Sequence, residues 1–255
     1  MDVPKTLERA TIIDHKTLAP AVRQLDLCAP NIARLAAPGQ FVHLRIGSTY
    51  DPLLRRPFSI AGVEGDVVRI IYRVVGRGTV LLEILATGDK VDCLGPLGRG
   101  FDLDCRRPLL VGGGMGLAPL VYLAQHLCPR PQTVLMGGRT SRELFWADIF
   151  RDSCDRIHIT TDDSSLGQPG TVVDVLPELL VSGDFDMIYT CGPRPMMEKV
   201  AAQAKNRAIP CQVSLEEHMA CGVGACLSCT CAGPDGKRRK ICTDGPVFWT
   251  WEVFP

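Results

Sequence analysis

The sequence has little that would draw the protein to a membrane or to nucleic acid. None of its apolar runs approaches the roughly 18 residues of a membrane span, and the opening stretch MDVPKTLERA lacks the apolar segment of a secretory signal. The formal net charge is zero, from 28 basic and 28 acidic residues, so no strong field favours nucleic acid or anionic lipid. No internal repeat is present. We therefore expect a cytoplasmic protein with neither of these partners.

A cytoplasmic location also makes disulfides a poor explanation for the twelve cysteines, because thiols stay reduced in that compartment. Clustered cysteines then indicate a metal, and scattered ones indicate small core residues. The scattered set, which we expect to be buried, consists of Cys28, Cys93, Cys105, Cys128, Cys154 and Cys211.

The 255 residues contain three stretches that differ in their pattern of apolar residues and in their cysteine content. The first hundred residues hold short, partly alternating apolar segments broken by Pro and Gly, which predicts a small antiparallel β-barrel. These segments are ERATIIDHKTL, AVRQLDLCA, QFVHLRI, PFSIAGV and DVVRIIYRVV. From Phe101 onwards apolar strands alternate with helical stretches, which predicts a parallel α/β sheet. The last 45 residues are rich in cysteine. The predicted fold is thus multidomain β plus α/β, with units at 1–101, 102–210 and 211–255.

Within the stretch CGVGACLSCTC, the spacing of Cys221, Cys226 and Cys229 is that of a plant-type [2Fe–2S] ferredoxin, which needs a fourth cysteine. Cys231 and Cys242 compete for that place. A two-residue hairpin turn at Asp235-Gly236 would make Cys229 face Cys242, which favours Cys242 as the ligand. Zinc is the main alternative, although it prefers two separated Cys-x-x-Cys pairs; structural thiols are another.

Two loops in the middle of the chain suggest a nucleotide site. LLVGGGMGLAPL places several glycines between an apolar strand and a helix, where backbone amides can approach a pyrophosphate. DMIYTCGPRPMM ends a second strand, and ligands of such sheets bind at the carboxyl ends of the strands. Cys191 could then touch a nicotinamide ring, or be an ordinary buried thiol. The predicted nucleotide-binding residues are Gly112, Gly114, Gly116, Thr190, Gly192 and Pro193.

A flavin site is indicated by two motifs in the first hundred residues. RRPFSI offers Arg56 for phosphate, Phe58 as an aromatic surface and Ser59 for the ring. GRGT precedes the short predicted helix VLLEIL, and Thr79 is a natural N-cap there, so the helix start could seat a diphosphate. Each motif alone is weak, since an isolated Arg56 is more often part of a surface ion pair. Their order along the chain makes them stronger together.

The series RPFS, GRGT, GGGMGLAPL and CGP resembles the ferredoxin–NADP reductase superfamily. The tail LEEHMACGVGACLSCTC…RKICTDGPVF resembles the electron-transfer subunits of class 1B dihydroorotate dehydrogenases. This resemblance implies an FAD barrel, an NAD-binding domain and a [2Fe–2S] domain. It also implies a partner catalytic subunit that carries FMN and oxidises dihydroorotate in pyrimidine (UMP) biosynthesis, in a heterotetramer of two subunits of each kind.

The resemblance also implies roles for individual residues. Phe58 departs from the pattern, because many members of the superfamily have Tyr there. The residues that match the flavin motifs are Arg56, Pro57, Phe58 and Ser59 for the ring, Ile71, Tyr72 and Arg73 for a backbone stretch beside it, and Gly78 and Thr79 for the phosphates. The residues that match the cluster ligands are Cys221, Cys226, Cys229 and Cys242.

Together these features predict an oxidoreductase component that converts between two-electron transfer at NAD(H) and one-electron transfer at the cluster, with the cofactors supplying the chemistry. Asp162 and Asp163 would repel a 2′-phosphate and favour NAD, whereas Arg139 could bind one. The terminal GPVFWTWEVFP suits either an interface core or a tail packed on its own domain. Three alternatives remain: a related flavin subunit of a bifurcating transhydrogenase, sulfide dehydrogenase or hydrogenase; a non-enzymatic metal-binding or redox-sensing module; and a zinc-ribbon adaptor.

Overall fold

The computed structural model describes residues 4–47 and 49–255. By packing, these residues form two compact units. The first contains the chain up to Gly100 together with residues 216–231 and 238–247, and the second contains residues 101–215, 232–237 and 248–255. The predicted three-part division stays a prediction about functional parts, because packing shares the cysteine-rich tail between the two units.

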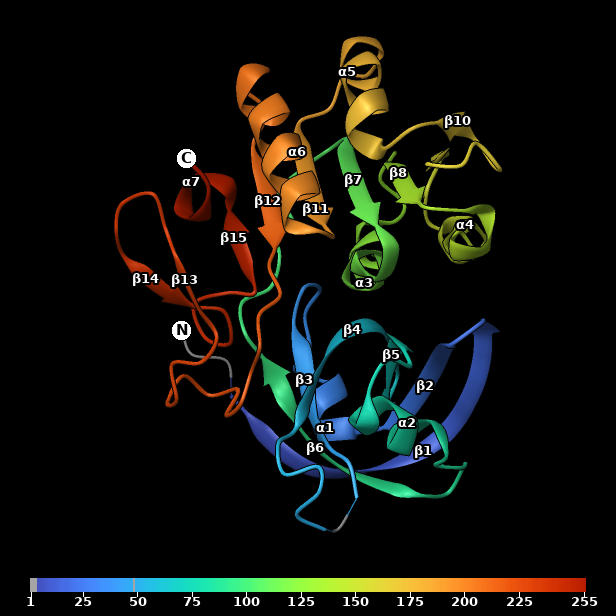
Figure 1. Cartoon of the computed structure of the whole chain (residues 1–255), viewed down its shortest axis with the longest axis vertical. Helices are drawn as coiled ribbons and strands as arrows, with labels where there is room; N and C mark the ends of the chain where they lie inside the picture. Colours follow the sequence, from blue (N-terminus) through green and yellow to red (C-terminus); the bar gives the residue numbers. More distant parts are fainter. Residues whose placement is uncertain (1–3, 48) are drawn as a thin grey trace. The chain divides into compact units, whose positions relative to one another are not determined.

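The first unit is built on a closed six-stranded barrel, which confirms the predicted barrel (Figure 1). Its strand order is β1-β2-β5-β4-β3-β6, and every neighbouring pair is antiparallel. The strands are β1 (Thr6–Ala19), β2 (Val22–Cys28), β3 (Phe41–Arg45), β4 (Arg56–Glu64), β5 (Val67–Arg73) and β6 (Lys90–Leu97), and the helices are α1 (Pro30–Ala33) and α2 (Arg77–Glu83).

The sixth strand, β6, was not among the predicted segments. Gly95 and Pro96 interrupt its apolar residues, so its sequence reads as a loop. In the barrel Gly95 instead lies against the Val42 side chain, where a Cβ would come within 2.9 Å of Val42 Cγ1. The glycine is therefore a close-packing position in a strand.

One ion pair joins two adjacent barrel strands. Arg69 on β5 donates from Nε and Nη2 to the two carboxylate oxygens of Asp26 on β2, at 2.8 and 2.7 Å. Asp26 is buried and also accepts from Gln24. A bidentate pair of this kind fixes geometry as well as adding energy, so it helps to hold the β2–β5 register.

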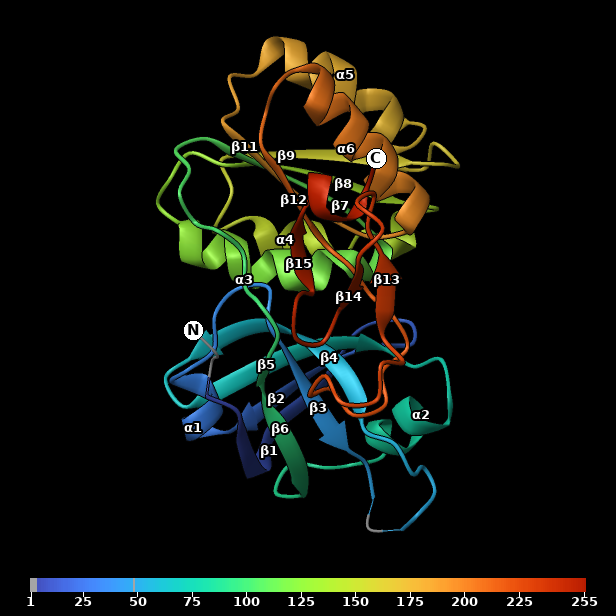
Figure 2. The ribbon, with the colours of Figure 1, turned by 90° about the vertical axis from the view of Figure 1, so that its left-hand side faces the viewer.

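The second unit contains a sheet with the order β10-β9-β8-β7-β11-β12-β15, in which every neighbouring pair from β10 to β12 is parallel, as predicted. Helices α3 and α4 cover one face, and α5 and α6 cover the other (Figure 2). The strands are β7 (Pro108–Gly113), β8 (Thr133–Gly138), β9 (Arg156–Thr161), β10 (Gln168–Pro169), β11 (Met187–Cys191), β12 (Cys211–Ser214) and β15 (Val247–Trp249). The helices are α3 (Leu117–Leu127), α4 (Trp146–Phe150), α5 (Val172–Ser182), α6 (Arg194–Asn206), α7 (Thr250–Val253) and the 3₁₀ turns η1 (Gly114–Gly116) and η2 (Ser141–Glu143).

Strand alternation explains why this sheet is covered on both sides. Leu109 and Val111 of β7 pack with the buried side chains of α5 and α6, including Leu176 and Val200. Gly112, which follows Val111 and so points to the opposite face of the sheet, faces α3, where a Cβ would lie 2.5 Å from a methyl carbon of Leu117. The strands of a sheet buried on both faces have continuous apolar sequences. The strands of this region have such sequences.

The cysteine-rich tail forms a small hairpin of β13 (Thr230–Ala232) and β14 (Arg238–Lys240). Beyond it, Phe248, Val253 and Phe254 are buried, and the rings of Trp249 and Trp251 stack at 4.8 Å. Trp251 nevertheless keeps 60% of its surface exposed. The terminal aromatics are therefore largely packed within their own unit, with one ring at the surface.

Most of the scattered cysteines are buried, as expected, but two are not. Cys128 is exposed and Cys28 is half-buried. Cys128 is the C-cap of α3, where the chain leaves the core at the end of the helix. Among the described residues, no helix combines the length and apolar character needed to cross a membrane.

Candidate functional site

The loop that carries Cys221 and Cys226 directs backbone amides at sulfur. The amides of Val223 and Cys226 both donate to Cys221 Sγ at 3.4 Å. Gly222 and Gly224 adopt φ of +70° and +82°, a left-handed conformation that glycine adopts readily. The two glycines thus produce the bend that turns these amides inward.

Two pairs of cysteines result. Cys226 lies beside Cys221 and the Ser228 hydroxyl, and hydrogen bonds from Ser228 and then from Cys221 lower the pKa of Cys226 to about 6. Cys242 lies beside Cys229, and burial followed by this neighbour raises the pKa of Cys242 to about 12. The amide of Gly224 also donates to Cys242 and opposes that rise. Gly224 therefore links the loop pair to the pair on the hairpin.

This arrangement suits a binuclear cluster. Among the described residues, no three His, Cys, Asp or Glu side chains converge to hold a single metal ion. A tetrahedral zinc site needs four ligands around one point, whereas a [2Fe–2S] cluster takes four thiolates, which corresponds to two per iron. The chemistry of the donor set fits the cluster.

The predicted hairpin register is wrong by one residue. Gly233 donates to the carbonyl of Lys237 and Ile241 donates to that of Cys229, so Cys229 faces Ile241. The turn holds three residues, with Gly236 at φ +75° and its amide bonded to the Gly233 carbonyl, which is a longer hairpin loop than Asp-Gly alone indicates. Cys242 still contacts Cys229, one residue beyond the paired position. Cys231 lies on β13 and is buried, as Cys229 and Cys242 are.

The two predicted flavin motifs come together in the first unit. Gly78 lies against the Arg56 guanidinium, and a Cβ at Gly78 would come within 2.8 Å of Arg56 Nε. Arg56 also donates to the Leu54 carbonyl at 2.6 Å. The strand β4 and the helix α2 thus place the arginine of one motif beside the glycine of the other, close to the helix start.

Thr79 is not the N-cap of α2. The helix begins at Arg77 with Gly76 as its N-cap, so Thr79 occupies the third helical position. Its hydroxyl accepts from the amides of Val75 and Gly76, at 2.9 and 3.0 Å, and donates to the Gly76 carbonyl. The sequence signal for a helix start was correct, but threonine closes the first turn from inside it.

Phe58 and Tyr72 form the aromatic part of this region. Their rings meet edge to face at 5.5 Å. The Tyr72 hydroxyl donates to His15 Nε2 at 2.9 Å, because His15 Nδ1 must carry the proton that it donates to the Leu85 carbonyl at 2.8 Å. Burial raises the pKa of Tyr72. The remaining predicted flavin residues lie on the same two strands, with Pro57 and Ser59 on β4 and Ile71 and Arg73 on β5.

The two predicted nucleotide loops meet at one edge of the parallel sheet. Cys191 pairs with Gly112 in the β11–β7 register. A Cβ at Gly116 would lie 2.5 Å from the Cys191 carbonyl oxygen, and one at Gly192 would lie 3.1 Å from the Gly113 amide. Only glycine permits this approach of two backbones.

Other predicted residues of this edge have defined positions. Gly114 has φ +56° and open space beside it, and Pro193 is the N-cap of α6. The side chain of Cys191 is buried. The Thr190 hydroxyl is buried and has no hydrogen-bond partner among the described residues, so it is a donor that a ligand at this edge could satisfy.

The residues that bear on the choice of nicotinamide follow β8 and β9. Arg139 donates from Nε and Nη2 to Glu143 Oε1, at 3.2 and 2.8 Å. Asp163 accepts from the Ser165 hydroxyl and amide, and these bonds lower the pKa of Asp163. Arg139, the cation expected to bind a 2′-phosphate, is therefore already paired with a carboxylate.

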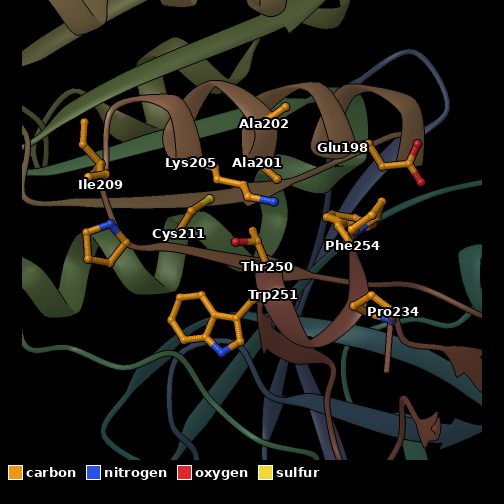
Figure 3. A pocket seen from close by; sticks show the side chains of 13 residues that line it. Glu198, Ala201, Ala202, Lys205, Ile209, Cys211, Pro234, Thr250, Trp251 and Phe254 are labelled. Carbon is orange, nitrogen blue, oxygen red and sulfur yellow. The ribbon is translucent and has the colours of Figure 1, made fainter. Parts of the chain in front are cut away.

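A groove of about 720 Å³ in the second unit lies apart from all these residues. Figure 3 shows it between α6, which contributes Glu198 and Lys205, and the terminal segment, which contributes Trp251 and Phe254. None of the predicted site residues lines it. We assign it no role in cofactor binding.

Sequence reasoning missed one residue of interest. His43 on β3 is fully buried, and neither of its ring nitrogens has a hydrogen-bond partner among the described residues. A single histidine in a β-strand belongs to no motif, so only its surroundings in three dimensions distinguish it.

Comparison with known proteins identifies the family. The chain is 42% identical over 257 residues to "Dihydroorotate dehydrogenase B (NAD(+)), electron transfer subunit" of Geobacillus thermodenitrificans, covering 96% of this chain and 98% of that one. The same subunit of Desulforamulus reducens is also 42% identical, over 253 residues, with coverages of 96% and 97%. The chain belongs to this family. A family model described as "Iron-sulfur cluster binding domain of dihydroorotate dehydrogenase B" matches residues 216–254.

Solved structures agree with the fold. An NADH-dependent reduced ferredoxin–NADP oxidoreductase, described for flavin-based electron bifurcation, aligns with a TM-score of 0.86 and 31% identity, over 96% of this chain and 90% of that one. The ferredoxin–NADP⁺ reductase of Neisseria gonorrhoeae shares the fold at a TM-score of 0.64 and 16% identity, over 78% and 91% of the two chains. The predicted family, fold class and oxidoreductase role are confirmed, and the comparisons support the predicted FAD, NAD and [2Fe–2S] cofactors. As an electron transfer subunit, the chain works with a catalytic subunit.

Proposed function

We propose that this chain passes electrons between NAD(H) and the FMN of a dihydroorotate dehydrogenase catalytic subunit, through FAD and a [2Fe–2S] cluster, in pyrimidine biosynthesis. The main support for the proposal is that a chain of this family brings Cys221 beside Cys226 and Cys229 beside Cys242. These two pairs provide four thiolates for a cluster that exchanges single electrons. We further propose a cytoplasmic heterotetramer of two subunits of each kind.

The cluster would be held by Cys221 and Cys226 on one iron and by Cys229 and Cys242 on the other. The amides that donate to Cys221 stabilise a thiolate at that position, because hydrogen bonds to sulfur lower the cost of negative charge. Cys231 is left as an additional buried thiol. The hydrogen bond from Ser228 acts in the same direction on Cys226.

The flavin would be held by β4, β5 and the start of α2. Arg56 offers a charged donor for the diphosphate, and Gly78 leaves room for it. Thr79 fixes the first turn of α2 through its bonds to Val75 and Gly76, so its role is to shape the backbone at the phosphate end. Pro57, Phe58, Ser59, Ile71, Tyr72 and Arg73 would line the flavin ring.

The nicotinamide would bind at the edge where Gly112, Gly114 and Gly116 meet Thr190, Gly192 and Pro193. Glycines there allow close approach of the backbone to a pyrophosphate, and the unpartnered Thr190 hydroxyl can donate to the ligand. Cys191 would contact the nicotinamide ring. When bound, the cofactors supply hydride acceptance and one-electron transfer, and the protein supplies their placement.

A second candidate function has one observation in its favour. The likeness to the bifurcating ferredoxin–NADP oxidoreductase spans nearly the whole of both chains. A flavin subunit of such an enzyme would have the same cofactor residues and a different partner. The higher identity to the dihydroorotate dehydrogenase B subunits favours the first proposal, and identification of the co-purifying partner distinguishes the two.

The proposed cluster is tested by exchanging single cysteines in the full chain. Cys226→Ser should abolish the [2Fe–2S] absorbance and the EPR signal of the reduced protein, because one thiolate ligand is lost. Cys231→Ser is the matched control, five residues further along, and should keep both signals. Loss of the cluster in Cys231→Ser with retention in Cys242→Ser would mean that the ligand set is wrong.

A further inference from the structure

His43 is a buried polar side chain whose ring nitrogens form no hydrogen bond with the described residues. The residue lies in the middle of β3 with 0% of its surface exposed. Its Nδ1 and Nε2 both lack a hydrogen-bond partner among the described residues. Burying a polar group without a partner is costly, so most buried polar atoms in native proteins have one. Two orphan nitrogens on one ring therefore call for an explanation.

His43 neighbours both predicted cofactor regions of the first unit. Its ring contacts Gly222, which follows the predicted ligand Cys221; a Cβ at Gly222 would come within 2.6 Å of His43 Nδ1. Its backbone pairs with β4, where its partner is Pro57 of the flavin motif. Phe41, two residues earlier on the same face of β3, meets the ring edge to face at 5.9 Å.

The imidazole is neutral at physiological pH. Burial, together with the positive charges of Arg55 and Arg56, lowers the pKa of His43 to about 4. A neutral imidazole carries one N–H donor and one lone pair. The neutral ring thus offers one N–H donor, in contact with a loop that would surround an anionic cluster.

We propose that His43 donates a hydrogen bond to the [2Fe–2S] cluster site, to a ligand thiolate or a bridging sulfide, and so raises the reduction potential of the cluster. The inference rests on the proposed cluster ligands. Gly222 is needed in this arrangement because any side chain there would separate the ring from the loop. Reduction adds one electron to the cluster, and a donor to sulfur stabilises the more negative state.

The first test uses the full chain with its own sequence, co-purified with its catalytic subunit and labelled with ¹⁵N-histidine. Pulsed EPR of the reduced cluster should detect a nitrogen coupling from histidine. The coupling should disappear in His43→Leu and persist in His218→Leu. His218 is the matched control, because it is exposed and lies three residues before Cys221. Absence of any histidine coupling in the unaltered protein would overturn the proposal, even if the variant did not fold.

The second test is the potential of the cluster. His43→Leu should lower the ratio of reduced to oxidised cluster about tenfold at a fixed poise, which for one electron corresponds to about 59 mV. His43→Gln, which restores an N–H donor, should recover part of the shift. An unchanged cluster potential with an altered flavin potential would mean that the ring serves the flavin, and no change in either would mean that it only fills space.

Different results would contradict the proposed function and the proposed role of His43. A protein that forms no cluster even with its own cysteines would contradict the proposed function, and His43 would then have no such partner. A protein that forms the cluster through Cys226 but shows neither a histidine coupling nor a shift in potential would contradict the role of His43 alone.

Discussion

Gly78 on α2 is constrained by the side chain of Arg56 on strand β4. A methyl group there would come within 2.8 Å of Arg56 Nε and 3.2 Å of Arg56 Cγ. The side chain it meets is long, so Arg56 would move rather than the backbone. Gly76, two residues earlier, has open space around the position of its Cβ and an extended φ of −156°. The two glycines of one motif are therefore under different constraints.

Gly78→Ala should weaken FAD binding by about 1 kcal/mol, or roughly fivefold in Kd, because it displaces the Arg56 guanidinium from the phosphate end. It should not lower stability, since alanine has the higher helix propensity. Titration of the apoprotein with FAD measures the first effect and urea denaturation the second. Gly76→Ala is the control and should leave FAD affinity unchanged. If Gly78→Ala and Gly76→Ala bound FAD with equal affinity, Arg56 would not contact the diphosphate.

Individual residues could be predicted from the sequence where the chemistry of a site requires a fixed spacing along the chain. The three cysteines at Cys221, Cys226 and Cys229 were recognisable because a cluster loop needs that interval. The choice of Cys242 over Cys231 agrees with its contact to Cys229, although the register argument behind it was wrong by one residue. His43 was not predictable, because its importance comes from Gly222, 179 positions away along the chain (222 minus 43).

At the scale of elements, the parallel sheet was easier to predict than the barrel. Its strands are short apolar runs followed by glycine turns, and the carboxyl ends of β7 and β11 meet as the rule for open sheets requires. The barrel depends on closure, and β6 pairs with both β1 and β3 to provide it. Closure is a non-local property, so a strand interrupted by Gly95-Pro96 gave no local sign of it.

The loops after β8 and β9 should make NADH the preferred nicotinamide. Glu143→Gln removes the carboxylate that holds Arg139, which leaves the guanidinium able to bind a 2′-phosphate. The ratio of kcat/KM for NADPH to that for NADH should rise about threefold, since an exposed charge contributes well under 1 kcal/mol. Steady-state dye reduction with both nucleotides gives the ratio.

Glu198→Gln is the matched control for that change, because Arg194 and Glu198 form an exposed pair with the same i,i+4 spacing. It should leave the ratio as it is. If Glu143→Gln also leaves the ratio of kcat/KM values unchanged, or if the unaltered protein already prefers NADPH, then Arg139 and the aspartates do not determine the choice between NADH and NADPH.

At the scale of the whole molecule, the functions assigned to the residues of this chain predict which steps it performs and which the catalytic subunit performs. We assign the predicted site residues of this chain to cofactor binding, and we propose none of them as a base for proton abstraction. Oxidation of dihydroorotate needs a base within hydrogen-bond reach of the substrate carbon, which the catalytic subunit would provide. The family name, an electron transfer subunit, agrees with this separation.

The purified chain should therefore oxidise NADH with artificial acceptors and show no oxidation of dihydroorotate. Addition of the FMN-containing catalytic subunit should create dihydroorotate-dependent reduction of NAD⁺, followed at the absorbance of NADH. Cys226→Ser should block that coupled reaction, because the cluster is the one-electron relay, while it spares much of the direct dye reduction by the flavin. Cys231→Ser should support both reactions. Turnover of dihydroorotate by this chain alone, free of any FMN protein, would place the substrate site here and refute the separation of roles.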